Sequence, residues 1–129
     1  MATEIQMLAW AIVLGLLHVV LTVVLATFDK GLKWNLGARD SEGPPTSAIA
    51  ARVNRGLRNF LETFPFFAAA VLAVVATGRA DAISALGAQL YFWARLVYVP
   101  VYAAGVPLLR TLVWTVSVAG LLMVLIGLF

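Results

Sequence analysis

Long uncharged stretches alternate with short polar segments along this chain. The first stretch runs from Ile5 to Phe28, 24 residues without a charge, and the last runs from Thr111 to Phe129, 19 residues without a charge. A helix of 24 residues is about 36 Å long, which exceeds the hydrocarbon core of a bilayer, about 30 Å thick. Both stretches therefore predict membrane-spanning helices.

Local start and stop signals predict two further helices between them. Thr46 or Ser47, after a pair of prolines, can cap a helix. This helix begins polar, becomes uncharged in its second half, and can end at Gly78. Asp81 can cap the next helix, and Gly105 can end it.

The pattern as a whole predicts an all-α integral membrane protein. Residues 1–129 form a single domain with helices at about 5–28, 48–77, 82–104 and 108–129. The segment between the first two helices, 29–47, contains glycine, proline and charge and is predicted to be one long loop.

The composition supports a membrane protein. Hydrophobic residues make up 63% of the chain and charged residues 12%, against about 45–50% and about 25% in soluble domains. A chain of this size cannot bury so much apolar surface in an aqueous core. The chain has no cysteine and one histidine, which excludes disulfides and thiolate sites and argues against a multi-histidine metal centre.

The basic residues predict orientation in the membrane rather than nucleic-acid binding, because they lie next to apolar stretches. Of the nine basic residues, only Arg79 belongs to the second connection, which joins the second and third predicted helices. The other eight lie around the first and third connections: Lys30, Lys33, Arg39, Arg52, Arg55, Arg58, Arg95 and Arg110. The positive-inside rule places these connections in the cytoplasm and both termini on the opposite side. A short chain without an evident retention signal favours a bacterial inner membrane.

Polar residues gather on one face of each middle helix. On the second helix, one face of about 120° carries Arg52, Arg55, Arg58, Asn59 and Glu62. On the third helix, a stripe contains Tyr91, Arg95, Tyr98 and Tyr102. Because an ionised side chain at the bilayer centre costs about 2.5–3.5 kcal/mol, Arg95 and Glu62 should face the bundle, a partner or water.

These faces have structural as well as functional interpretations. Arg58, Asn59 and Glu62 could form a salt-bridge network that holds helices together, or they could bind a ligand. The tyrosines could form an interfacial aromatic belt. His18, in the first helix, is expected to hydrogen-bond to a neighbouring helix rather than to act as a catalyst.

Three motifs resemble the MAPEG family, the membrane-associated proteins in eicosanoid and glutathione metabolism. They are RNFLETFPFF over 58–67, ARLVYVPVY over 94–102 and PLLRTLVWT over 107–115. They occur in the family's order and at the expected helix positions, so the resemblance covers essentially the whole chain. One departure is Trp114, which stands where some members of the family have a tyrosine.

The resemblance implies a homotrimer that binds glutathione as a co-substrate between subunits, near the cytoplasmic side. It assigns glutathione binding to Arg58, Asn59, Glu62, Arg95, Tyr98 and Tyr102, and catalysis to Arg110 and Thr111. Lys30 or Lys33 would add a basic residue near the end of the first helix. No metal site is implied.

The side chains also suit this ligand on chemical grounds. Glutathione carries two carboxylates, an ammonium group and a thiol; arginines can bind the carboxylates, and Glu62 can bind the ammonium. The sequence thus predicts a glutathione-dependent transferase or peroxidase that acts on lipophilic small molecules from the membrane. The alternatives are a non-catalytic membrane scaffold and a small transporter.

Overall fold

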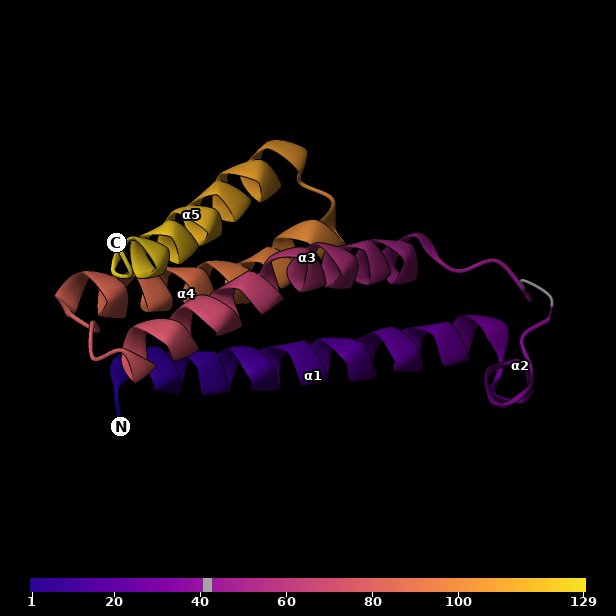
Figure 1. Cartoon of the computed structure of the whole chain (residues 1–129). Helices are drawn as coiled ribbons and strands as arrows, with labels where there is room; N and C mark the ends of the chain where they lie inside the picture. Colours follow the sequence, from indigo (N-terminus) through magenta and orange to yellow (C-terminus); the bar gives the residue numbers. More distant parts are fainter. Residues whose placement is uncertain (41–42) are drawn as a thin grey trace.

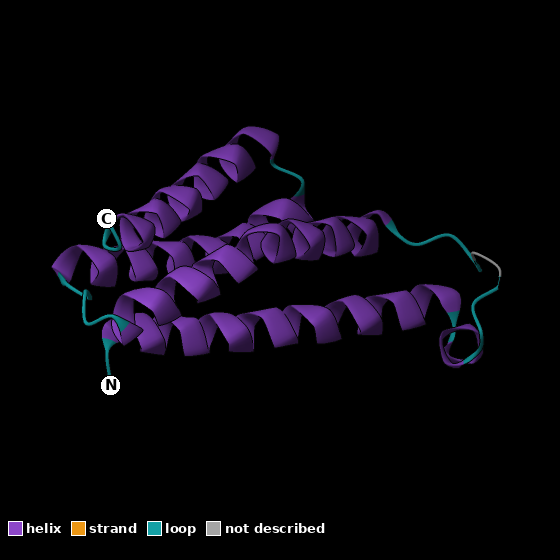
Figure 2. Cartoon of the chain, in the orientation of Figure 1, coloured by secondary structure: helices purple, strands orange, loops and turns teal. Residues whose placement is uncertain are grey.

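The computed structural model describes residues 1–40 and 43–129. Four long helices run through it, α1 (Thr3–Lys30), α3 (Ala48–Ala76), α4 (Ala82–Ala104) and α5 (Pro107–Ile126), and a short helix α2 (Leu32–Leu36) follows α1 (Figure 1). Figure 2 shows only helices and loops, and within the described ranges no strand is present. The predicted all-α fold is confirmed.

The four long helices are each long and apolar enough to cross a membrane. Both termini lie at one end of the bundle, and α2 lies at the other (Figure 1). Much of the outer surface is apolar; Leu16 and Leu17, for example, are 63% and 62% exposed. An exposed apolar surface of this extent is stable in lipid rather than in water.

Capping residues set the helix ends that position the site. Ser47 caps α3 by accepting a hydrogen bond from the Ala50 amide at 3.2 Å. Asp81 and Ser84 form a reciprocal capping box at the start of α4. Gly105 ends α4 with φ +76°, a left-handed conformation that glycine adopts without strain.

The segment 29–47, predicted to be one loop, is partly helical. The prediction was wrong because α1 continues to Lys30, and α2 forms immediately after Gly31, whose φ is +88°. Side-chain contacts support this short helix: Asn35 donates to the Thr27 hydroxyl at 2.7 Å. The Lys30 ammonium lies 4.7 Å from the centre of the Trp34 ring. Five residues are too few to produce a detectable helical period.

The core lies between α1, α3 and α4, with one contribution from α5. The rings of Phe67 and Tyr91 stack with their centroids 4.0 Å apart, and the Tyr91 hydroxyl bonds to Thr63 at 3.0 Å. The buried cluster comprises Leu8, Ala11, Phe60, Phe67, Ala70, Val71, Val74, Ala88, Tyr91, Phe92 and Val124.

A histidine joins α1 to α3 inside the bundle. His18 is 4% exposed, and its Nε2 lies 2.9 Å from the carbonyl oxygen of Val53. Because a carbonyl can only accept, the imidazole donates this bond. The expectation that His18 is a helix-to-helix hydrogen bonder is confirmed.

Candidate functional site

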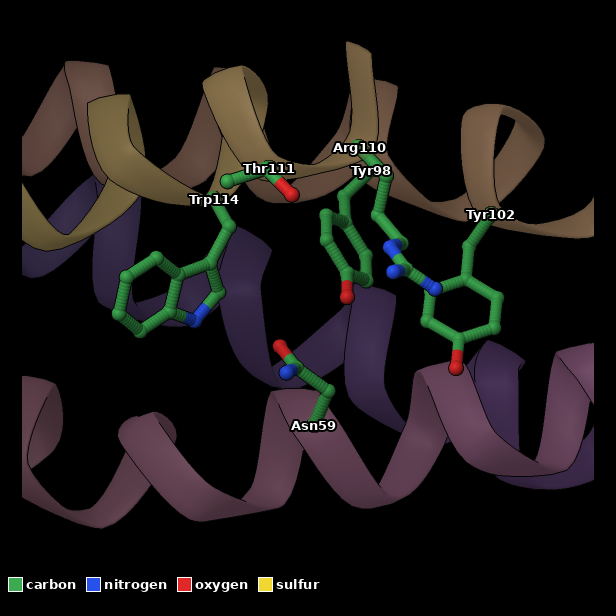
Figure 3. A pocket seen from close by; sticks show the side chains of 6 residues that line it. All are labelled: Asn59, Tyr98, Tyr102, Arg110, Thr111 and Trp114. Carbon is green, nitrogen blue, oxygen red and sulfur yellow. The ribbon is translucent and has the colours of Figure 1, made fainter. Parts of the chain in front are cut away.

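A polar cavity of about 320 Å³ lies between α3, α4 and α5. α4 and α5 converge towards the end that carries the C-terminus and diverge towards their connection (Figure 1). The cavity lies near this connection, and its lining residues are Asn59, Tyr98, Tyr102, Arg110, Thr111 and Trp114 (Figure 3). Five of these six residues are among those that the sequence predicts for the site.

Helical spacing and one tight connection bring these side chains together. Tyr98 and Tyr102 are four residues apart on α4, and their ring centroids are 5.5 Å apart. Pro107 begins α5 directly after the Gly105 turn, so the first turn of α5 follows the last turn of α4 closely. The Arg110 guanidinium consequently lies 5.0 Å from the centre of the Tyr102 ring.

Arg110 is the charged group of the cavity. It is partly buried and lies on the first turn of α5, where the helix dipole also favours an anion. A guanidinium in contact with an aromatic face keeps most of its donors available. Arg110 can therefore bind an anionic group that enters between α4 and α5.

Thr111 offers a hydroxyl beside this cation. In this structure its Oγ1 donates to the Pro107 carbonyl at 3.2 Å. The two lone pairs of the hydroxyl remain free to accept. For Thr111 to donate to a ligand, its hydroxyl proton would have to turn away from Pro107.

Arg95 lies behind the cavity wall. The side chain is 1% exposed, and its Nη1 donates to Asn59 Oδ1 at 2.8 Å. Its guanidinium lies 4.2 Å from the centre of the Tyr98 ring and 5.5 Å from that of Phe60. The expectation that Arg95 faces the bundle is confirmed, and its contacts are with two residues of the cavity wall.

The comparison with models of protein families matches residues 7–129 to the MAPEG family. The chain belongs to the MAPEG family. The search of curated proteins found no match. Family membership and the four spanning helices together make this an integral, multi-pass membrane protein.

Two other predicted site residues of this MAPEG protein, Arg58 and Glu62, do not line this cavity. Arg58 is exposed and lines a second cavity, of about 720 Å³, between α1, α2 and α3. Glu62 is exposed and belongs to the lining of neither cavity. Arg58 and Asn59 are adjacent in sequence, so they point about 100° apart around α3. A single MAPEG subunit therefore does not bring Arg58 and Glu62 to the cavity that Arg110 lines.

The second cavity contains further basic residues, and one of them is Lys30, which the family resemblance offered as an additional basic residue of the site. Lys30, Arg39 and Arg55 line it with Arg58. Arg52 instead donates to the Ala103 carbonyl at 3.2 Å and ties α3 to the end of α4. The predicted polar face of α3 is thus divided between two sides of the helix.

Trp114 is the lining residue that the sequence analysis did not place in the site. It follows Arg110 by four residues, the spacing that puts two side chains on one face of a helix. Applying that spacing to Arg110 would have included Trp114 among the site residues of this MAPEG protein.

Proposed function

We propose that this MAPEG protein binds glutathione and uses it as a transferase or peroxidase acting on lipophilic electrophiles. The observation that carries the proposal is the cavity in which the Arg110 cation, the Asn59 amide and the hydroxyls of Tyr98 and Tyr102 converge within a membrane bundle. A cation, an amide and two hydroxyls are groups that bind a charged, polar ligand. Such groups are costly next to lipid-facing helices unless they bind a partner of this kind.

The size of the cavity favours a site shared between subunits. A volume of about 320 Å³ is at the lower end of the range for ligand sites, about 300–1,000 Å³. It suits part of a tripeptide, and the remainder would extend over the rim. Arg58 and Glu62 are exposed on α3, where contact with lipid would be costly. In the proposed homotrimer they complete the site of the neighbouring subunit, Arg58 binding a carboxylate and Glu62 the ammonium.

Arg110 and Thr111 would activate the thiol. A free thiol with a pKa near 8.5 is only a few per cent thiolate at pH 7, and a neighbouring cation lowers that pKa. Arg110 supplies the cation, and the Thr111 hydroxyl supplies a hydrogen bond once it turns towards the sulfur. The amino-terminal position of both residues on α5 adds the favourable end of the helix dipole.

The thiolate would attack a substrate that arrives from the lipid. With an aryl halide, a sulfur–carbon bond forms and the halide leaves with the bonding electrons. With a lipid hydroperoxide, the sulfur takes the terminal oxygen and the alkoxide leaves, taking up a proton to become the alcohol. A second glutathione then converts the sulfenic acid to the disulfide and water.

The distribution of charge supports a cytoplasmic site. The second cavity is rich in basic residues and is lined in part by α2. α2 and the α4–α5 connection both lie away from the two termini (Figure 1). The positive-inside rule places this end in the cytoplasm and both termini outside. We propose a bacterial inner membrane as the location.

Titration and turnover together test the proposal. Purified protein in detergent should bind glutathione in isothermal titration, and Arg58→Ala, Glu62→Gln and Arg110→Ala should each weaken binding. Arg79→Ala is the matched control, because Arg79 donates to the Leu128 carbonyl at the opposite end of the bundle. Turnover is measured with an aryl halide and with a lipid hydroperoxide.

Three outcomes are distinguishable. Glutathione binding with turnover of either substrate supports the enzyme. Glutathione binding without turnover of either substrate would reject catalysis. No binding by the wild-type protein would reject the glutathione site and favour a non-catalytic scaffold, in which the buried polar contacts serve only to hold helices together.

A further inference from the structure

We propose that Arg95 is a positioning residue, which holds the Asn59 amide so that its NH₂ group faces the ligand and which makes no ligand contact of its own. The inference rests on the proposed function, because the ligand is taken to be glutathione. It follows from the hydrogen bond between Arg95 Nη1 and Asn59 Oδ1 and from the burial of the guanidinium behind the cavity wall.

The hydrogen bond determines which end of the amide is presented to the cavity. An asparagine side chain has one acceptor oxygen and two N–H donors. Because Arg95 occupies the oxygen at 2.8 Å, the Nδ2 donors are the groups left for a ligand. Asn59 lines the cavity and projects from α3 towards the side of α5 that carries Trp114 (Figure 3). The amide is thereby set to donate to an anionic group such as a carboxylate.

Arg95 also supports a second wall residue. Its guanidinium lies 4.2 Å from the centre of the Tyr98 ring, and Tyr98 lines the same cavity. Arg95 itself is 1% exposed and is not among the lining residues. It therefore contacts Asn59 and Tyr98 from the side opposite the ligand.

The hydrogen bonding of Arg95 argues against a purely stabilising role. Its Nε has no hydrogen-bond partner among the residues that the structure describes. A buried cation with an unsatisfied donor is costly in a membrane bundle. Orientation of Asn59 is a function that an apolar side chain could not perform.

A double-mutant cycle tests the proposal. Arg95→Met keeps a long apolar side chain and removes the donor, so Asn59 is free to turn its oxygen towards the ligand. We expect the glutathione KM and Kd to rise about tenfold, the scale of one hydrogen bond to a charged group, while kcat changes little. In an Asn59→Ala background, Arg95→Met should cost much less affinity than in the wild-type background, because the Asn59 amide is already absent and only the contact with Tyr98 is left to lose.

Two comparisons separate positioning from ligand contact and from general destabilisation. Independent, additive losses of affinity in the cycle would show that Arg95 binds glutathione directly and would overturn the proposal. Arg95→Lys retains one donor that can reach Asn59 and should restore part of the affinity lost in Arg95→Met. A loss of affinity that tracks a fall in thermal stability across the variants would instead assign Arg95 a merely structural role.

A ligand-free measurement tests the contact by itself. The Asn59 side-chain amide gives a ¹⁵N resonance, which is assigned by its disappearance in Asn59→Asp. A guanidinium bonded to Oδ1 polarises the amide, so Arg95→Met should shift this resonance, and Arg95→Lys should shift it less. An unchanged resonance in Arg95→Met would overturn the proposal. If the resonance shifts but wild-type protein binds no glutathione, the proposed function fails while the positioning contact stands.

Discussion

Gly87 of α4 and Gly120 of α5 meet backbone to backbone. A Cβ atom added to Gly87 would lie 2.6 Å from the Gly120 carbonyl oxygen, and one added to Gly120 would lie 2.5 Å from the Gly87 carbonyl oxygen. Both glycines are buried. Small residues of this kind let membrane helices approach closely, and here they bring α4 and α5 together beyond the site.

Gly120→Ala should destabilise the protein. Alanine gains up to about 1 kcal/mol of helix propensity over glycine, whereas overpacking costs about 1–3 kcal/mol. The second effect should prevail because the clash is with backbone atoms, which cannot move aside unless α5 itself moves. We expect a lower midpoint of thermal unfolding in detergent. Ala119→Val, at the exposed neighbouring position, is the control; equal or higher stability of Gly120→Ala would contradict the packing described.

His18→Leu should loosen α1 from α3. The substitution removes the donor to the Val53 carbonyl, a buried bond of 2.9 Å, and losing such a bond costs about 1–3 kcal/mol. His18→Gln keeps a donor and should lose less. Thermal unfolding of the two variants measures the difference, and identical midpoints would show that the bond contributes nothing.

Arg110→Ala should raise the pKa of the glutathione thiol when it is bound. The cation favours the thiolate, so without it a higher pH is needed to ionise the sulfur, by about one unit or more. The ultraviolet absorbance of the thiolate, followed against pH at saturating glutathione, measures this pKa. Arg79→Ala should leave the curve unchanged, and an unchanged curve for Arg110→Ala would reject its role in activation.

Trp114 should report ligand binding through its fluorescence. It lines the cavity and is 37% exposed, so bound glutathione changes the surroundings of its indole. We expect Trp114→Phe to abolish most of the fluorescence change that glutathione causes in the wild-type protein. Trp93→Phe is the matched control, because Trp93 lines an apolar groove between α4 and α5. A response that survives in Trp114→Phe and disappears in Trp93→Phe would place the ligand in that groove.

Hydrophobic runs and caps made much of this fold predictable. The all-α membrane fold follows from uncharged stretches long enough to cross a bilayer. Capping by Asp81 and the left-handed turn at Gly105 are local events, which depend on one or two neighbouring residues. α2 was missed because a five-residue helix after Gly31 depends on contacts with Thr27 and with the Trp34 ring rather than on periodicity.

The site was only partly predictable for a geometric reason. Helical spacing correctly groups Tyr98 with Tyr102, and it would group Arg110 with Trp114. It does not tell which neighbour each face of α3 meets. Arg58 and Asn59 share a broad polar face by sequence, yet they line different cavities of the subunit.

The sequence by itself determined that four apolar helices cross a membrane and that cations gather at one end, because length, hydropathy and caps act over neighbouring residues. Only the tertiary structure decided that Asn59 faces α4 and α5 while Arg58 faces α1 and α2, and that Arg95 lies behind Asn59 instead of in the cavity. Those outcomes depend on how the helices are rotated and how closely they pack. Contacts between residues far apart in the chain set both the rotation of the helices and the closeness of their packing.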